Sequence, residues 1–337
     1  MPARVGIREV AAVAAVAQGT VSHFLNHPDR VSEEKRERIQ RAIDQLGFVR
    51  NDAASQLRRG TSDTIAYIAP DVSNPFFATI AEGVEQQAAA NGLSVFLANS
   101  NRSREREDAY LEMFQAHRVL GMLVASHDPI EDRLLHIRRR GTPTVLVGQR
   151  ALGSDQPSVS VDDVTGGYLA VQHLIAQAGR RIAFVGGPLG IQQIGDRLEG
   201  AGRAVREAGD ATMEVINVDN RTIAEGRLVA AAIASRPPAN RPDAIFAAND
   251  LLALGIMHGL VVDHGIRIPA DMLLVGYDDI EFGAASIIPL TSIRTPHEGF
   301  GIAAVDLLTA EIANSDAGRK KNIVLQPELV VRASTRG

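Results

Sequence analysis

The sequence predicts an N-terminal all-α helix-turn-helix head, followed by an α/β core of two doubly wound lobes. Two observations lead to this prediction. The first sixty residues show short helical patterns and no strand pattern, whereas from Thr64 onward apolar runs rich in Val and Ile alternate with amphipathic helical patterns. Such alternation is typical of parallel strands that are buried between helices.

The composition narrows the class of protein. Hydrophobic residues make up 45% of the 337 residues, which is enough for two or three packed domains. The absence of cysteine excludes disulfide bridges, thiolate metal sites and a cysteine nucleophile, and it suits a reducing compartment. No apolar run reaches the roughly 20 residues of a membrane span, so we expect a cytoplasmic protein.

Charge is unevenly divided along the chain. The net charge is −5, but residues 1–60 hold ten Lys or Arg against seven Asp or Glu, so this segment is positive and the remainder is acidic. Nucleic-acid phosphates attract basic surfaces. Only the first segment therefore has the charge expected of a DNA-binding part.

The head pattern predicts two helices, 7–14 and 18–26, joined by a tight turn at 15–17. At 100° per residue, Val21 and Leu25 share one face of the second helix, while the opposite face is polar and small. A recognition helix in the DNA major groove has this character, but a helical dimerisation module would show the same spacing. A third, structural helix is expected after Ser32, which is placed to cap it.

Several residues of the head resemble one family. They are Val10, Ala11, Val16, Thr20, Val21, Ser22, Leu25, Asn26, Val31, Ser32, Ile43, Leu46, Gly47 and Phe48. This set resembles the head of the lactose/galactose repressor (LacI/GalR) family, which favours DNA binding over dimerisation alone. The resemblance implies that bases are contacted by Gln18, Gly19, Ser22 and His23, and phosphate or sugar by Thr20, Asn26 and Arg30.

The head also departs from the family pattern. Gly6 and Ala17 replace the hydroxyl residues that commonly cap the first two helices, and Ala15 stands at the usual turn glycine. A lost cap costs about 1 kcal/mol, so we expect the fold to survive. His23 replaces a common arginine and does not reproduce the bidentate contact of arginine with guanine, so we expect a different base preference.

Residues 51–60 resemble the hinge helix of the same family, which folds over the minor groove when it is paired with its twin. The resemblance implies DNA contacts from Asn51, Ala54, Leu57 and Arg58, with Leu57 as a wedge between base steps and Arg58 at phosphate. A flexible linker with a stray leucine is the alternative. Arg50 replaces the proline that is common before the asparagine.

The core pattern consists of two series of βα units. The first series has strands at 64–72, 94–99, 121–125 and 144–148 and helices at 74–91, 104–118 and 131–139. The second has strands at 158–161, 182–186, 213–218, 244–247 and 272–277 and helices at 165–178, 195–208, 223–235 and 251–264. Strand 291–293, helix 298–312 and strand 323–325 are expected to return to the first lobe. Glycines are expected to end several helices in the left-handed conformation, namely Gly92, Gly141, Gly179, Gly209 and Gly265.

These patterns give domain boundaries. The head is expected at 1–48, the hinge helix and linker at 49–63, and the effector-binding and dimerisation core at 64–337. Within the core, lobe one comprises about 64–162 and 291–325, and lobe two about 163–290 and 326–337. Family landmarks continue through the core to Arg332, so the resemblance implies a core like that of periplasmic binding proteins, a homodimer or higher oligomer, and a bound sugar or related metabolite.

Ligands of doubly wound sheets bind at the carboxyl ends of the strands. The candidates at these ends are Phe76, Phe77, Arg197, Asn249 and Asp278, with Asp162, Asp163 and Asp250 as weaker ones because each acidic residue is equally suited to capping a helix or to a salt bridge. Guanidinium, carboxylate and amide groups suit a polyhydroxylated ligand. Arg221 joins the candidates because many sugar-responsive relatives place an aromatic residue in its segment, and it leaves room for an acidic or smaller ligand.

The expected function is that of a sequence-specific DNA-binding regulator, a repressor whose affinity for a palindromic operator is controlled by a small-molecule effector. A solute-binding protein of transport is the alternative, since the two-lobed core alone would fit it. An enzyme is not expected, because no Gly-x-Gly-x-x-Gly follows the first core strand and no catalytic or metal-spaced set of residues is present. We therefore expect no cofactor and no metal.

Overall fold

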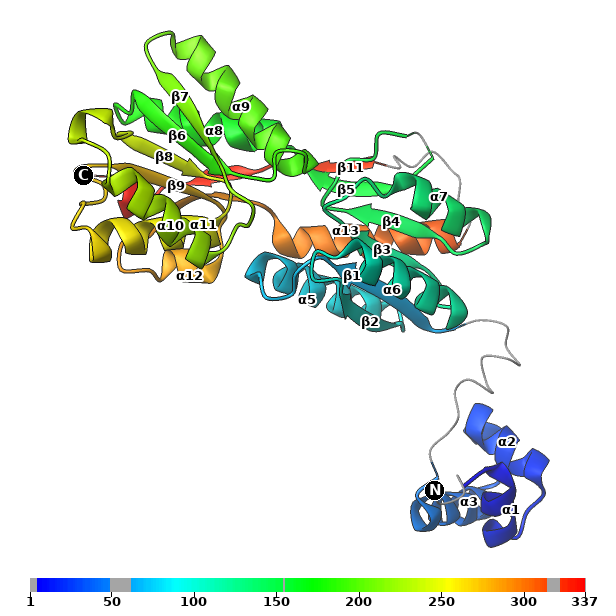
Figure 1. Ribbon diagram of the computed structural model, residues 1–337. Helices are drawn as coiled ribbons and strands as arrows, with labels where there is room; N and C mark the ends of the chain where they lie inside the picture. The colour runs from blue at the N-terminus through cyan, green and yellow to red at the C-terminus, as the bar shows by residue number, and fades with distance from the viewer. Residues whose placement is uncertain (1–4, 49–61, 154, 314–321, 337) are drawn as a thin grey trace. The chain divides into compact units, whose positions relative to one another are not determined.

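The computed structural model describes residues 5–48, 62–153, 155–313 and 322–336, and the chain divides into two compact units, Met1–Ser62 and Asp63–Gly337 (Figure 1). The predicted DNA contacts at Asn51, Ala54, Leu57 and Arg58 lie outside the described residues. Among the described residues, no helix has the length and apolar character needed to cross a membrane.

The first unit is helical. It contains α1 (Ile7–Ala14), α2 (Gln18–Asn26), the short 3₁₀ helix η1 (Pro28–Arg30) and α3 (Glu33–Leu46). Its small core is formed by Val10, Ala14, Val21, Ile39 and Ala42, and Phe24 and Leu46 pack against it. The predicted apolar face of the second helix is thus the face that packs on its neighbours.

The turn between α1 and α2 holds an alanine in the left-handed conformation. Ala15 has φ +50° and ψ +49°, which costs an L-residue roughly 1–2 kcal/mol. Arg38 of α3 donates from Nη2 to the carbonyl oxygens of Ala14 and Ala15, at 2.7 and 2.9 Å. A single guanidinium group therefore stabilises a turn in which alanine, rather than the more permissive glycine, adopts the left-handed conformation.

The helix caps of the head are weak, as expected for α1 and α2. Gly6 and Ala17 precede these helices, and neither makes a side-chain cap; at α1 the Glu9 carboxylate instead accepts a hydrogen bond from the Gly6 amide at 2.8 Å. The expectation for Ser32 was wrong, because its side chain makes no capping bond to α3.

Lobe one of the second unit is a six-stranded parallel sheet in the order β11-β5-β4-β3-β1-β2. Its strands are β1 (Thr64–Ala69), β2 (Ser94–Asn99), β3 (Met122–Ala125), β4 (Thr144–Val147), β5 (Ser158–Val161) and β11 (Asn322–Leu325). One face packs against α5 (Pro75–Ala90) and α13 (His297–Ile312), and the other against α6 (Arg104–Ala116) and α7 (Glu131–Arg139).

Lobe two is a mixed sheet in the order β12-β10-β9-β8-β6-β7, in which only β12 runs antiparallel to its neighbour. Its strands are β6 (Arg181–Gly186), β7 (Thr212–Asn217), β8 (Ala244–Ala247), β9 (Leu273–Asp278), β10 (Thr291–Arg294) and β12 (Glu328–Val330). Helices α8 (Asp163–Ala176) and α9 (Gln192–Ala208) cover one face, and α10 (Ile223–Ala234) and α11 (Asp250–His258) the other. Beyond them lie a π-helical turn (Gly259–Asp263) and the short α12 (Glu281–Ala284).

Two expectations about the core are corrected by the structure. Strand β10 belongs to lobe two rather than lobe one, because it pairs with β9 and buries Ile293 in the lobe-two core. At the end of α8 the left-handed residue is Ala178, with φ +67°, and not Gly179. Gly179 is needed for space instead, since a Cβ there would lie 2.9 Å from the Cβ of Ala244.

Candidate functional site

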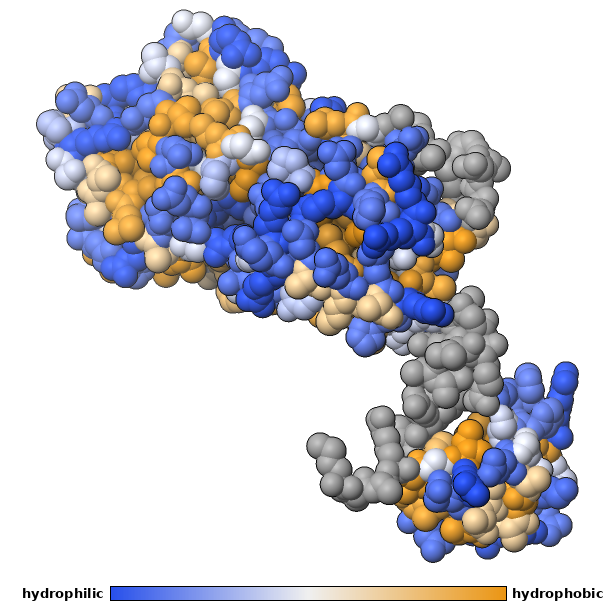
Figure 2. All heavy atoms as spheres, turned by 45° about the vertical axis from the view of Figure 1, so that its right-hand side comes forward, coloured by the Kyte–Doolittle hydropathy of each residue, from blue (hydrophilic) through white to orange (hydrophobic). Residues whose placement is uncertain are grey.

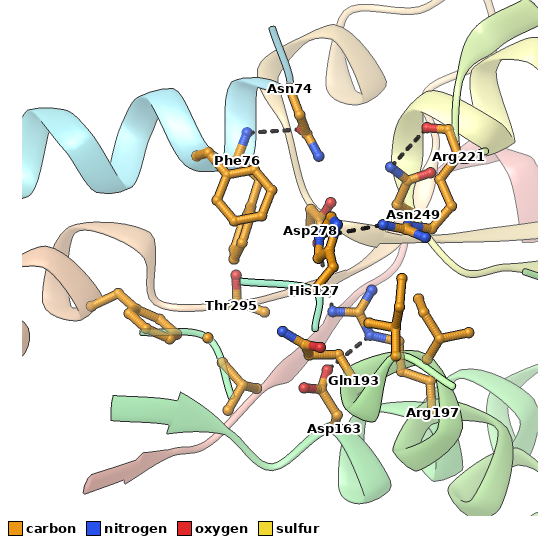
Figure 3. A pocket seen from close by; sticks show the side chains of 16 residues that line it. Asn74, Phe76, His127, Asp163, Gln193, Arg197, Arg221, Asn249, Asp278 and Thr295 are labelled. Atoms are coloured by element: carbon orange, nitrogen blue, oxygen red, sulfur yellow. Dashed lines mark hydrogen bonds and ion pairs between the residues drawn. The ribbon is translucent and has the colours of Figure 1, made fainter. Parts of the chain in front are cut away.

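A cleft opens where the carboxyl ends of the strands of both lobes meet (Figure 3). Its lining from lobe one is Asn74, Phe76, Phe77, His127, Gly148, Val161 and Phe300. Its lining from lobe two and the connections to it is Asp163, Ile191, Gln193, Ile194, Arg197, Arg221, Asn249, Asp278 and Thr295. His127, Gly148, Asn249 and Thr295 come just after strands and Asp278 ends one, which is where doubly wound sheets bind their ligands.

Arg197 is the centre of a polar network on the lobe-two wall. Its Nε donates to Asp163 Oδ1 at 2.8 Å and its Nη1 donates to the Ala248 carbonyl. Its guanidinium group also lies 3.5 Å from the centre of the Tyr277 ring and 3.9 Å from the Asp278 carboxylate. Arg197 is buried, and these partners hold its side chain in one position.

Asp278 ends β9 in an unusual backbone conformation. It has φ +103°, and the next residue, Asp279, has φ +58°. Such conformations cost roughly 1–3 kcal/mol each and persist only where the surroundings enforce them. Here Arg294 and Arg332 hold the Asp279 carboxylate at 2.7 and 2.6 Å. Burial raises the pKa of the Asp278 carboxyl to about 7, so this group changes its protonation near neutral pH.

Asn249 connects two elements of the cleft. Its Oδ1 accepts the Leu252 amide at 3.0 Å and thereby caps α11, while its Nδ2 donates to the Arg221 carbonyl at 3.3 Å. The amide therefore positions the segment that carries Arg221, in addition to lining the cleft.

Arg221 and His127 approach one another from opposite lobes. Arg221 Nη2 lies 3.4 Å from His127 Nε2, and Arg221 Nη1 donates to the Gly187 carbonyl. Burial, together with the charge of Arg221, lowers the pKa of His127 to about 3, so this imidazole is neutral at physiological pH. Burial and the nearby Arg197 lower the pKa of Arg221 to about 10.

Aromatic side chains form the lobe-one wall of the cleft. Phe76 and Phe77 lie 5.0 Å apart, and Phe300 lies 6.5 Å from Phe76, both in edge-to-face geometry. Asn74 caps the helix that carries the first two, accepting the Phe76 amide at 3.1 Å. The chain contains no tryptophan, and this wall of phenylalanines supplies aromatic area for a ligand instead.

Two predicted effector residues lie outside this cleft. Asp250 is buried behind it, where its carboxylate accepts the Ser292 hydroxyl at 2.6 Å and the Ile280 amide at 2.8 Å. The alternative prediction that Asp250 caps α11 was wrong, because Asn249 is the capping residue. Asp162 caps α8 through the Thr165 amide at 2.9 Å. The other seven predicted residues all line the cleft, namely Phe76, Phe77, Asp163, Arg197, Arg221, Asn249 and Asp278.

The sequence reasoning missed several lining residues. His127 and Thr295 follow strands β3 and β10, so the strand-end rule was sufficient to find them. Gln193 and Phe300 lie within helices, where no local signal distinguishes them from residues that face solvent or core. Among the described residues, no group of three or more acidic or histidine side chains is arranged to hold a metal ion.

The second site candidate is the polar face of α2. Gln18, Gly19, His23 and Asn26 are exposed, and a Cβ added at Gly19 would contact nothing within 4 Å. Arg30 is also exposed, whereas Thr20 and Ser22 are half-buried and Val21 is buried. The helix thus exposes most of the predicted residues, as a recognition helix would.

A helix-turn-helix unit combined with a two-lobed core that has a polar cleft defines the class of effector-responsive DNA-binding regulators. Two family profiles match the chain: "Bacterial regulatory proteins, lacI family" over residues 6–51, and "Periplasmic binding proteins and sugar binding domain of LacI family" over residues 62–330. The chain belongs to the LacI family.

Curated relatives match along almost the whole chain. An HTH-type transcriptional repressor PurR from Vibrio atlanticus is 32% identical over 336 residues, covering 98% of both chains. The HTH-type transcriptional repressor CytR of Escherichia coli is 29% identical, covering 98% of this chain and 96% of that protein.

Solved structures of similar regulators match the fold over almost the whole chain. The lac repressor dimer bound to operator and the anti-inducer ONPF has a TM-score of 0.85 at 26% identity, covering 99% of this chain and all of that one. A CelR–cellobiose complex has a TM-score of 0.71 at 32% identity, covering 98% of this chain and all of that one. The chain is therefore a LacI-family helix-turn-helix transcriptional repressor with an effector-binding core, and the prediction that it is not an enzyme is confirmed.

Proposed function

We propose that this protein represses transcription by binding a palindromic operator as a homodimer, and that a sugar or related metabolite in the cleft between its lobes controls this binding. The observation that supports the proposal most directly is the cleft itself, which combines the Arg197–Asp163 pair, Asn249 and Asp278 with an aromatic wall. Hydrogen-bonding groups opposite apolar rings are what a polyhydroxylated ring needs.

The same cleft gives the control a physical basis. Lining residues come from both lobes, so a ligand contacts both and favours one relative orientation of them over another. Coupling between two sites is typically worth 1–3 kcal/mol, or roughly 5–150-fold in affinity. The sign of the response, induction or co-repression, is an outcome of the experiment below.

Dimerisation of the core is supported by apolar residues on its surface. Phe96 and Leu97 of the edge strand β2 are 49% and 53% exposed, and Leu228 of α10 is 67% exposed. Figure 2 shows hydrophobic residues gathered in patches among hydrophilic ones on one face of the core. Exposed apolar patches commonly mark a protein interface. We propose the domain limits predicted from the sequence, with the head at 1–48 and the dimerising core from 64.

On the DNA side, we propose that Gln18, Gly19, Ser22 and His23 contact bases and that Thr20, Asn26 and Arg30 contact phosphate or sugar. Asn51, Ala54, Leu57 and Arg58 would contact the minor groove as a hinge helix. A repressor with this role acts in the cytoplasm, where its operator is.

The test is operator selection with the full chain, followed by anisotropy titration of the selected duplex at stated salt, with and without sugars, polyols and nucleosides. Gln18→Ala should weaken specific binding roughly 5–150-fold for each half-site, because it removes a base contact worth about 1–3 kcal/mol. Gln45→Ala, a matched change at an exposed position of α3, should leave binding unchanged. Selection of no palindromic sequence by folded protein would refute the proposed function.

A further inference from the structure

The two arginines that line the cleft have very different surroundings. Arg197 lies among the carboxylates Asp163 and Asp278, at 2.8 and 3.9 Å, so its charge is compensated within the protein. The described hydrogen bonds of the Arg221 guanidinium instead go to a backbone carbonyl and to a neutral imidazole. Arg221 therefore places a positive charge at the cleft that lacks a carboxylate contact of its own among the described residues.

Arg197 and Arg102 disfavour the positive charge of Arg221, while Asp278 and Asp71 favour it. Each of these two carboxylates lies 3.9 Å from another arginine, Asp278 from Arg197 and Asp71 from Arg102. His127 is surrounded by the guanidinium groups of Arg221, Arg102 and Arg197, and their combined charge helps to keep its ring neutral. Arg102 lies 3.9 Å from Asp71 and donates to Asn220 at 2.8 Å, so the nearby acidic residue Asp71 already has a partner. A partly buried cation with neutral partners is costly unless an anion joins it.

Arg221 is also accessible from outside the cleft. A second hollow, lined by Arg102, Asn220 and Gly190 among others, shares His127, Ile191 and Arg221 with the cleft. Arg221 and His127 thus lie where the two hollows meet. Figure 3 shows the Arg221 side chain directed toward His127, on the opposite side of the cleft from Phe76.

We propose that the effector carries an oxyanion, a carboxylate or a phosphate, that Arg221 binds beside His127. This inference depends on the proposed function and narrows its ligand class. The hydroxyl groups of the ligand lie against Arg197, Asn249 and Asp278, and its carbon skeleton against Phe76 and Phe300. The expected ligand is therefore a sugar acid or a sugar phosphate rather than a neutral sugar. Guanidinium groups recognise both oxyanions through paired N–H donors.

The test is calorimetric titration of the full-length protein with matched pairs of compounds that differ only in the acidic group. The carboxylate arm compares aldonates with alditols and uronates with the neutral sugars, and the phosphate arm compares sugar phosphates with the same sugars. At least one anion should bind tenfold or more tightly than its neutral counterpart. The arm in which this happens identifies the oxyanion.

Variants assign the preference to one residue. Arg221→Gln should lose tenfold or more in affinity for the anion and change affinity for the neutral partner less than twofold, while Arg221→Lys should recover part of the loss. Arg206→Gln, at an exposed position of α9, is the matched control and should bind like wild type. Each variant is first checked for folding by circular dichroism, and its operator binding is measured alongside.

The outcomes separate this inference from the proposed function. Tighter binding of a neutral sugar than of every anion, equal loss of both by Arg221→Gln, or no binding of any anion overturns the oxyanion proposal. Each of these results leaves the regulator function standing if the same protein binds its selected operator. Failure of operator selection refutes the proposed function instead, whatever the calorimetry shows.

Discussion

The closest approach between helices in lobe two occurs where α8 crosses α9, and it leads to a sharp prediction for Gly200→Ala. A Cβ at Gly200 would lie 1.8 Å from the Val164 carbonyl oxygen and 2.7 Å from the Tyr168 amide nitrogen. On the facing helix, a Cβ at Gly167 would lie 2.0 Å from the Arg197 carbonyl oxygen. Both neighbours are backbone atoms, so the helices must move apart to accept even one methyl group.

The magnitude follows from two opposing effects. Overpacking a rigid contact costs typically 1–3 kcal/mol, and backbone atoms on both sides place this site at the upper end. Alanine in a helix interior gains about 1 kcal/mol over glycine. We expect a net loss of about 2 kcal/mol in the free energy of unfolding of the core. Because Asp163 and Arg197 lie on these helices, separation should also lengthen their 2.8 Å hydrogen bond and weaken effector binding.

The control is the same substitution on the same helix. A Cβ at Gly195 of α9 meets its nearest atom, the Leu189 carbonyl oxygen, at 3.4 Å, which is ordinary contact. Gly195→Ala should therefore keep or slightly raise stability. Urea unfolding of both variants, followed by far-ultraviolet circular dichroism, measures the difference. Equal stability of Gly200→Ala and wild type, or equal loss in both variants, would refute the packing argument.

Three further predictions concern pH, the head turn and base preference. Burial raises the pKa of Asp278 from 3.8 to about 7, so its contribution to stability is present below about pH 4 and lost as the pH rises through 7. Over this interval the melting temperature of wild type should fall relative to that of Asp278→Asn. Parallel plots of melting temperature against pH for the two proteins would contradict the assignment. Arg38→Gln should cost the head about 1 kcal/mol because Arg38 bonds the turn carbonyls, seen as faster hydrogen exchange in α1, whereas Arg41→Gln, exposed on the same helix, should not. His23→Arg should shift the selected operator sequence at one position of each half-site; an unchanged selection would show that this side chain reads no base.

Local sequence determined the elements of the core well but not all of their partners. Short apolar runs predicted the strands β2, β5 and β8 with the observed bounds. The sheet to which β10 belongs depends on pairing with β9, a non-local choice that its own residues do not encode. The three-residue strand β12 was not predicted, because a segment this short forms only against a partner edge.

The lining residues that could be predicted from the sequence are those whose position follows from the sheet topology alone. Strand ends converge in a doubly wound sheet, so Asn249 and Asp278 were found without any knowledge of contacts. Asn249 and Asp250 are adjacent and of similar size and polarity. Only packing decides that Asn249 caps α11 at the cleft, while Asp250 is buried and accepts a hydrogen bond from Ser292 of β10. Phe300 reaches the cleft because α13 crosses back to lobe one, which no local pattern indicates.

The position of Arg221 suggests how recognition of a ligand becomes a change of conformation. Arg221 and His127 come from different lobes and meet at 3.4 Å, and Gln192 of α9 exchanges hydrogen bonds with the backbone of Arg150 in lobe one, at 2.7 and 3.1 Å. A ligand shifts an equilibrium between two lobe orientations only by the difference between its affinities for them. An oxyanion bound by Arg221 beside His127 interacts with both lobes only when they are close, so its binding energy favours the closed orientation. A neutral ligand lacks this interaction and should couple more weakly, even if it fills the rest of the cleft.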